Sequence, residues 1–314
     1  MQFYSPDRLA GYTDTRDYVA LHEGRPVAGA RGYRLLTPAL AALVPEAPLR
    51  RLTTQREVRP EWLAAVRFSL VNAAFLVLTA AALQRLMLGL GFAFPAALLG
   101  TLLFFTAHPV VQSGSFPMVD AGSWCALAVG AMLVLERRAL LLALAFAVGM
   151  FAKETLVLLL PLTVLAPTSW RERARLLAAT VPGLAAYLAF RFWISPDPAE
   201  SYSRLSDLAS HPSMPLGWVA SVGTSPARLV DLLASFGLLW VPAIAALRRR
   251  DTPAVLRRWA LLVPILLALI VLAYWNLGRV LFYAFPVVIP LAVLGLERWW
   301  RDAAGSATRG TREG

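Results

Sequence analysis

Residues 139–166 read ALLLALAFAVGMFAKETLVLLLPLTVLA, two apolar runs separated by the charged pair Lys153 and Glu154. Lys153 is the only lysine of the chain, beside 29 arginines. Ionisable groups bordered by hydrocarbon are costly, and those that persist usually face a polar cavity, a substrate or each other. The stretch therefore predicts two short helices with a functional polar turn between them. The alternative is an interfacial turn whose lysine snorkels to the membrane surface.

The rest of the chain has the same apolar character. Of the 314 residues, 58% are hydrophobic and only 16% are charged, and the apolar residues cluster in long blocks. Such blocks are typical of helices in a bilayer. We predict an all-α, polytopic transmembrane bundle of about eight or nine helices, some of them short. The expected spans are 62–83, 92–110, 117–135, 139–151, 156–166, 176–194, 229–247, 259–275 and 280–296.

Arginine placement orients this bundle, because cytoplasmic loops carry an excess of Lys and Arg. Every second connection is rich in arginine, and the others are nearly bare. A single span over 139–166 would reverse this alternation upstream, so the pattern favours the split. The bare connections, expected on the outer face, are 108–116, 152–155, 195–228 and 276–279.

The chain is expected to have three parts. Residues 1–61 form an amphipathic extracytoplasmic segment with an interfacial helix at 35–44. Residues 62–297 form the transmembrane bundle, with an outer loop at 195–227, and residues 298–314 form a disordered cytoplasmic tail. Nothing hydrophobic precedes the bundle that would carry the first part across the membrane. We therefore expect that a first transmembrane helix is missing upstream.

The net charge of +11 does not call for a nucleic-acid partner. Most of the excess lies in the predicted cytoplasmic loops, where it serves topology and contacts anionic membrane lipids. The single cysteine, Cys125, excludes an intrachain disulfide, and three histidines without a close pair do not favour a His-rich metal site.

Acidic and basic side chains gather on the predicted outer face. A carboxylate there can take a proton from an acceptor hydroxyl, while lysine and arginine hold a departing phosphate. Together these side chains predict a shared site for group transfer from a phosphate carrier. The residues are Asp14, Asp17, His108, Asp120, Lys153, Glu154 and Arg279.

Three of these residues also have a structural interpretation. Asp120 is well placed to cap the helix that follows it, since aspartate is a favoured N-cap. Arg279 is placed to anchor a helix at the interface, and His108 is expected to be a helix-end residue. An aromatic belt at the membrane surface is predicted for Tyr274, Trp275 and Tyr283.

Five short motifs follow one another along the chain. They are YTDTRDY at 12–18, YRLLTP at 33–38, FPMVD at 116–120, KET at 153–155 and GR at 278–279. Their order and shared sidedness resemble the GT-C superfamily of membrane glycosyltransferases, which includes protein O-mannosyltransferases and the lipid A aminoarabinose transferase. The resemblance implies an enzyme that moves a sugar from a polyprenyl-phosphate donor to a lipid, glycan or protein acceptor. It also implies a bacterial cytoplasmic membrane with the active site on the extracytoplasmic side.

The resemblance implies an inverting transfer with Asp14 or Asp17 as the catalytic base and Asp120 as a supporting acid. Asp14 precedes Tyr18 by four residues, as in the family's Asp-Glu-x-x-Tyr pattern, but Thr15 replaces the glutamate, so both bases stay open. A divalent metal, if one is used, would bind Asp14 and Asp120. The family's first helix would lie just upstream, and its true absence could leave the chain inactive or misinserted even with the family assignment correct. The implied substrate-binding and phosphate-binding residues are Arg34, His108, Lys153, Glu154, which would orient Lys153, and Arg279.

Two other functions fit parts of the same pattern. A transporter or flippase fragment for an anionic substrate would use Lys153 and Arg279 to bind cargo, and would show broken helices in two related halves. A non-catalytic membrane scaffold would leave the outer charges scattered around the bundle. The enzyme requires that these charges converge.

Overall fold

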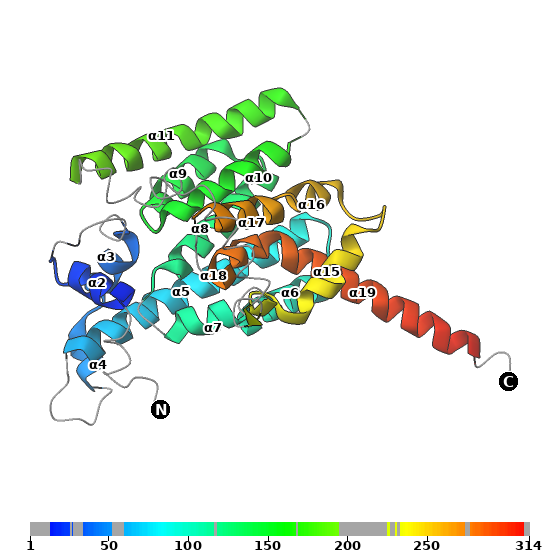
Figure 1. Cartoon of the computed structure of the whole chain (residues 1–314), viewed down its shortest axis with the longest axis horizontal. Helices are drawn as coiled ribbons and strands as arrows, with labels where there is room; N and C mark the ends of the chain where they lie inside the picture. Colours follow the sequence, from blue (N-terminus) through cyan, green and yellow to red (C-terminus); the bar gives the residue numbers. More distant parts are fainter. Residues whose placement is uncertain are drawn as a thin grey trace.

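The chain folds into helices. The computed structural model describes residues 13–25, 27, 34–51, 60–115, 118–167, 169–194, 225–226, 230, 233–273 and 277–310. Every regular element within these residues is a helix, as Figure 1 shows. The all-α class is therefore confirmed.

Three helical segments are long and apolar enough to cross a membrane. The first is Trp62–Gly89, within α5 (Pro60–Gly89), and the second is Trp170–Trp193, within α11 (Trp170–Ile194). The third is Gly278–Ala303, which runs from α18 through η4 into α19. These helices support an integral membrane protein, whereas the total of eight or nine spans stays a prediction. The last segment comprises α18 (Leu277–Leu281), η4 (Phe282–Ala284) and α19 (Phe285–Gly310).

Shorter helices fill the bundle between these three. The predicted span at 92–110 is divided, because α6 ends at Thr106 and α7 begins at His108. The remaining bounds are α6 (Phe94–Thr106), α7 (His108–Ser115), α8 (Asp120–Leu135), η3 (Gly237–Leu239), α15 (Trp240–Leu247), α16 (Ala254–Trp259) and α17 (Leu262–Ala273).

Residues 139–166 are split into separate helices, as predicted. Helix α9 (Ala139–Met150) is followed by a turn, by η2 (Glu154–Leu158) and by α10 (Leu159–Leu165). Lys153 adopts an extended backbone, with φ −168° and ψ 140°, which interrupts the helical path. The charged pair therefore lies on a turn between two apolar helices.

Three helix pairs build the bundle: α5 packs along α8, α9 along α11, and α15 along α19. Glycines bring two of these pairs close together, as small residues do between membrane helices. A Cβ atom at Gly183 of α11 would lie 2.8 Å from Cα of Ala147 in α9. A Cβ atom at Gly295 of α19 would lie 2.2 Å from the carbonyl oxygen of Pro242 in α15. Neither pair could approach as closely with a larger residue.

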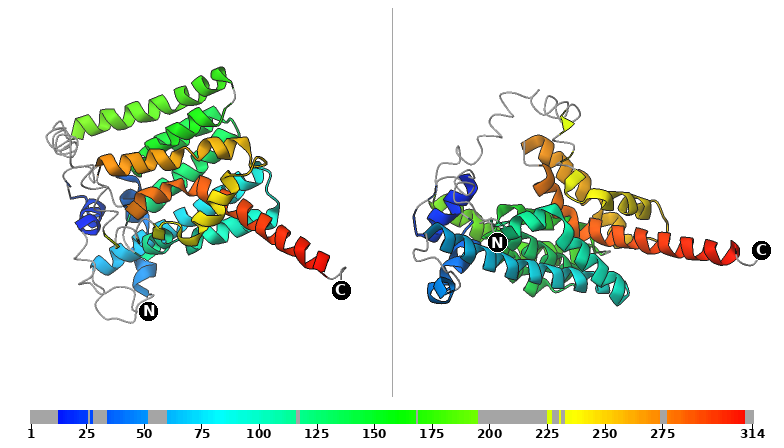
Figure 2. Two further views of the ribbon diagram at one scale, coloured as in Figure 1. Left: turned by 45° about the vertical axis from the view of Figure 1, so that its right-hand side comes forward. Right: turned by 90° about the horizontal axis from the view of Figure 1, so that it is seen from below.

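The N-terminal helices lie at one end of the bundle, opposite the projecting end of α19 (Figures 1 and 2). They are α2 (Thr13–His22), α3 (Leu36–Leu43) and α4 (Glu46–Arg51). A small core that includes Tyr18, Phe68 and Val119 joins this segment to α5 and to the start of α8. Helix α3 falls in the range of the predicted interfacial helix, but its place relative to a membrane stays a prediction.

The C-terminal part differs from the prediction. Residues 298–314 were expected to be a disordered tail, yet α19 continues through Gly310. Arg298, at the predicted boundary, is buried against Asp251 and Thr252, so the chain is anchored where the tail was predicted to begin. The predicted outer loop at 195–227 lies outside the described residues except for residues 225 and 226.

Candidate functional site

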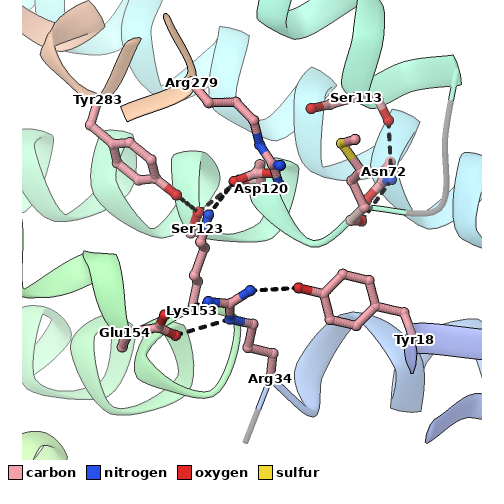
Figure 3. A network of polar contacts seen from close by, with 11 residues as sticks. Tyr18, Arg34, Asn72, Ser113, Asp120, Ser123, Lys153, Glu154, Arg279 and Tyr283 are labelled. Atoms are coloured by element: carbon pink, nitrogen blue, oxygen red, sulfur yellow. Dashed lines mark hydrogen bonds and ion pairs between the residues drawn. The ribbon is translucent and has the colours of Figure 1, made fainter. Parts of the chain in front are cut away.

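One buried carboxylate joins three separate elements at the end of the bundle that carries the N-terminal helices. Asp120 begins α8, Lys153 lies on the turn after α9, and Arg279 lies in α18 (Figure 3). Lys153 Nζ lies 2.6 Å from Asp120 Oδ1, and Arg279 Nε lies 3.0 Å from Asp120 Oδ2. Arg279 Nη2 also donates to the same oxygen, so the arginine forks around it. Asp120 thus holds two cations side by side.

A second ion pair lies beside the first. Arg34 Nε lies 3.0 Å from Glu154 Oε2, and Arg34 Nη2 donates to Glu154 Oε1. Arg34 Nη1 donates to the hydroxyl of Tyr18 over 2.6 Å. Burial alone would lower the pKa of Arg34, but the Glu154 carboxylate, with Tyr18, more than offsets this and raises that pKa well above its usual value. Both partners are therefore ionised at neutral pH.

Buried polar groups fix the first turn of α8. Ser123 donates to the carbonyl oxygen of Asp120 over 2.8 Å, and its hydroxyl also bonds to the hydroxyl of Tyr283. The ring centroid of Tyr283 lies 5.8 Å from Lys153 Nζ, within the range of a cation–π contact. Asn72 of α5 donates to the carbonyl oxygens of Ser113 and Met118, over 3.2 and 3.0 Å, and so anchors the chain before α8.

The cluster carries excess positive charge in a sheltered place. Three cations and two carboxylates leave a net charge of +1. The Asp120 side chain is 0% exposed, those of Lys153, Arg34 and Arg279 are 10%, 12% and 18% exposed, and that of Glu154 is 26% exposed. An uncompensated buried charge is destabilising unless something anionic pairs with it. The arrangement is therefore suited to bind an anion.

Five of the predicted site residues come together here: Arg34, Asp120, Lys153, Glu154 and Arg279. Their structural interpretations fail on geometry. The N-cap of α8 is Val119, and the carboxylate of Asp120 points to Lys153 and Arg279 instead. Lys153 is buried rather than snorkelling, and Arg279 pairs inward rather than anchoring at a surface.

The other predicted residues are placed differently. Asp17 lies in α2 directly before Tyr18, is partly buried and takes part in polar or electrostatic contacts. Asp14 also lies in α2, but its side chain is outside the described residues. His108 begins α7 with an exposed side chain, and within the described chain no hydrogen bond or ion pair joins it to the cluster. The catalytic role of either aspartate stays a prediction.

Sequence reasoning missed Ser123 and Tyr283. Tyr283 was assigned to an aromatic belt, yet its side chain is fully buried beside Lys153. Helical spacing was an available signal, because residues three or four apart share a helix face. Ser123 follows Asp120 by three positions, and Tyr283 follows Arg279 by four.

The donor set does not fit the divalent metal that the resemblance allows. Both oxygens of Asp120 accept hydrogen bonds from cations, and a divalent ion there would meet Lys153 and Arg279 at close range. The described residues also contain no group of three or more His, Cys, Asp or Glu side chains that could hold a metal. Asp120 is better explained as the holder of the two cations.

No family model matches this chain, and neither does any curated protein or solved structure. Its chemistry is therefore inferred from the residues of the cluster.

Proposed function

We propose that the protein is a membrane glycosyltransferase of the GT-C type, which moves a sugar from a polyprenyl-phosphate donor to an acceptor on the extracytoplasmic side. One observation carries the proposal. Lys153 and Arg279, from two different elements, converge on the buried Asp120 and leave excess positive charge at one end of an apolar bundle. A lipid-linked phosphate needs such a combination, because its chain stays in the bilayer while its headgroup carries negative charge.

The cations would act on the leaving group. The acceptor hydroxyl attacks the anomeric carbon, its proton passes to a carboxylate base, and the bond between that carbon and the phosphate oxygen breaks. Polyprenyl phosphate then leaves with additional negative charge. An ammonium has three N–H donors and a guanidinium has five, so Lys153 and Arg279 have the capacity to hold a phosphate oxygen while they bind Asp120. Charge that develops on the phosphate would be stabilised without reorganisation.

The base is proposed from the resemblance, as Asp14 or Asp17. Asp17 belongs to the same helix as Tyr18, which binds Arg34, so the N-terminal helices approach the cluster. Asp120 would act as a positioning residue and not as an acid, because both of its oxygens are engaged by cations.

The convergence of charges also weighs against the scaffold. A scaffold has no need to bury Lys153 and Arg279 together, since a buried ion pair contributes little net stability. A transporter for an anionic substrate shares the same phosphate chemistry. A transporter needs no chemical step, so formation of a glycosylated product distinguishes the glycosyltransferase from the transporter.

The test is sugar transfer by the purified full chain in proteoliposomes, from a panel of polyprenyl-phosphate-linked radiolabelled sugars. We expect release of polyprenyl phosphate, and at least a hundredfold loss of rate in Lys153→Ala and Arg279→Ala, on the scale of losing an electrostatic contact to the transition state. Arg85→Ala, which breaks an exposed ion pair with Glu136, is the control. Binding of polyprenyl phosphate without any turnover across the panel would favour the transporter.

A further inference from the structure

We propose that Arg34 is a positioning residue that holds the Glu154 carboxylate away from Lys153 and so keeps the cluster cationic for an anionic headgroup. The inference rests on the proposed function, because it concerns how the same cluster binds a lipid phosphate. It replaces the direct phosphate contact predicted for Arg34 and the orienting role predicted for Glu154.

The two carboxylates of the cluster are divided between separate cations. Both oxygens of Glu154 accept hydrogen bonds from Arg34, and both oxygens of Asp120 accept them from Lys153 and Arg279. Glu154 follows Lys153 directly in the chain, yet no hydrogen bond joins the two side chains in the described part of the structure. Glu154 therefore forms its hydrogen bonds with Arg34 and leaves the ammonium of Lys153 to Asp120.

Arg34 is itself held in place on both sides. Each of its three nitrogens donates a hydrogen bond, two to Glu154 and one to Tyr18. Two residues later, the backbone N–H of Leu36 donates to the carbonyl oxygen of Phe151 over 3.0 Å. This bond ties the chain after Arg34 to the turn that carries Lys153. The guanidinium is therefore directed at Glu154 and Tyr18, which engage three of its five N–H groups, whereas Asp120 engages only two of those of Arg279.

The pairing of Arg34 with Glu154 sets the net charge of the cluster. Lys153 and Arg279 carry two positive charges, and Asp120 with an unpaired Glu154 would carry two negative charges, which leaves no net attraction for an anion. Arg34 restores a net charge of +1. Both Arg34 and Glu154 lie within electrostatic range of Lys153. In a sheltered site, where the effective dielectric is lower than in water, such interactions are strong.

The experiment measures the affinity of the full chain in detergent micelles for farnesyl phosphate, a short lipid phosphate, with farnesol as the uncharged probe. We expect Arg34→Gln to weaken binding of farnesyl phosphate roughly tenfold, a common size of coupling between groups. The double variant Arg34→Gln with Glu154→Gln loses one charge of each sign and should return to near the wild-type affinity. Glu154→Gln alone should bind more tightly, because the net charge rises.

The ion pair Arg85–Glu136 provides the matched control. Arg85 Nε lies 2.6 Å from Glu136 Oε1. Glu136 lies at the other end of α8, about 24 Å from Asp120 at the rise of an α-helix. Arg85→Gln and Glu136→Gln should leave the affinity for farnesyl phosphate at the wild-type value, and farnesol should not distinguish any of the variants.

Several outcomes would overturn the inference. If the double variant binds as weakly as Arg34→Gln, then Arg34 contacts the phosphate or supports the fold, and the charge argument fails while the phosphate site stands. Weaker binding by Glu154→Gln alone has the same meaning, and this variant decides the matter if Arg34→Gln does not fold. If the wild-type chain does not prefer farnesyl phosphate over farnesol, both the inference and the proposed phosphate site are wrong.

Discussion

Arg279 and Arg298 lie on one continuous helical segment and differ in what surrounds them. Arg298 follows Arg279 by 19 positions, about 28 Å along a helix, so the two side chains lie at opposite ends of the bundle. Both are sheltered, with side chains 18% and 6% exposed. A buried arginine alone therefore does not indicate a functional site. The carboxylates and other cations around it distinguish the two positions.

At the end of the helix that carries Arg298, one sheltered cation has one carboxylate of its own. Arg298 lies 2.8 Å from Asp251 Oδ2 and 3.3 Å from Thr252 Oγ1, and Asp251 is 67% exposed. Thr252 in turn donates to the carbonyl oxygen of Ala246 over 2.5 Å, which closes the turn after α15. At the other end Arg279 shares the fully buried Asp120 with Lys153. Arg298 therefore joins α19 to the turn after α15 through a one-to-one ion pair, whereas Arg279 and Lys153 share a single carboxylate.

The largest expected difference concerns the two aspartates. Asp120→Ala leaves two sheltered cations without their carboxylate, so the free energy of unfolding should fall by about 3–5 kcal/mol. Asp251→Ala leaves one sheltered cation, Arg298, which keeps its hydrogen bond to Thr252, and removes a carboxylate that is already 67% exposed, so the loss should be smaller, about 1–2 kcal/mol. Denaturant titration of both variants in micelles measures the difference. Equal losses would mean that the two ends do not differ as described.

The packing of α19 against α15, next to Arg298, gives the next largest effect. Gly295→Ala places a Cβ atom 2.2 Å from the backbone oxygen of Pro242, which cannot rotate away, and we expect a loss of about 1–3 kcal/mol in unfolding free energy. Gly100→Ala is the control, because its nearest neighbour is the flexible end of Met87 at 2.4 Å. A Gly295→Ala variant as stable as Gly100→Ala would show that α15 and α19 are not in direct contact.

The smallest expected effect is a pH dependence where α2 contacts α5. His22 Nε2 lies 3.0 Å from Arg67 Nη1, and burial together with the Arg67 charge lowers the pKa of His22. The unfolded chain, with a histidine pKa of about 6.5, then takes up a proton before the folded chain does. Stability should therefore fall as the pH drops below about 6.5.

Thermal unfolding at pH 7.5 and at pH 5.5 measures this effect. His22→Gln cannot titrate, so it should lose part of the acid sensitivity that the wild-type chain shows. An identical pH response in both proteins would exclude His22 as its source.

The all-α class was predictable from the sequence, because the length of the apolar blocks and the position of the charges between them indicate helices and their ends. The break at Lys153 was predictable from two charges between apolar runs. The burial of Arg298 was not predictable, because its partners Asp251 and Thr252 lie on a turn 46 to 47 positions earlier in the sequence.

Five of the predicted site residues lie in one cluster, but the way in which they pair was not predictable. Asp120, Lys153, Glu154 and Arg279 were identified from type and predicted sidedness. Arg34 binds Glu154, which lies 120 positions away in the sequence. Local spacing does not predict such a tertiary contact. The same holds for the choice of Asp120, rather than Glu154, as the partner of Lys153.

The central claim is that only the end of the helix at Arg279 binds a lipid phosphate. It is tested most directly by the affinity for farnesyl phosphate of the wild-type chain, of Arg279→Gln and of Arg298→Gln. We predict that Arg279→Gln weakens binding at least tenfold, as expected when a charged hydrogen-bond donor to the phosphate is lost, and that Arg298→Gln binds like the wild type. Equal affinities in all three proteins, or an equal loss in both variants, would contradict the claim.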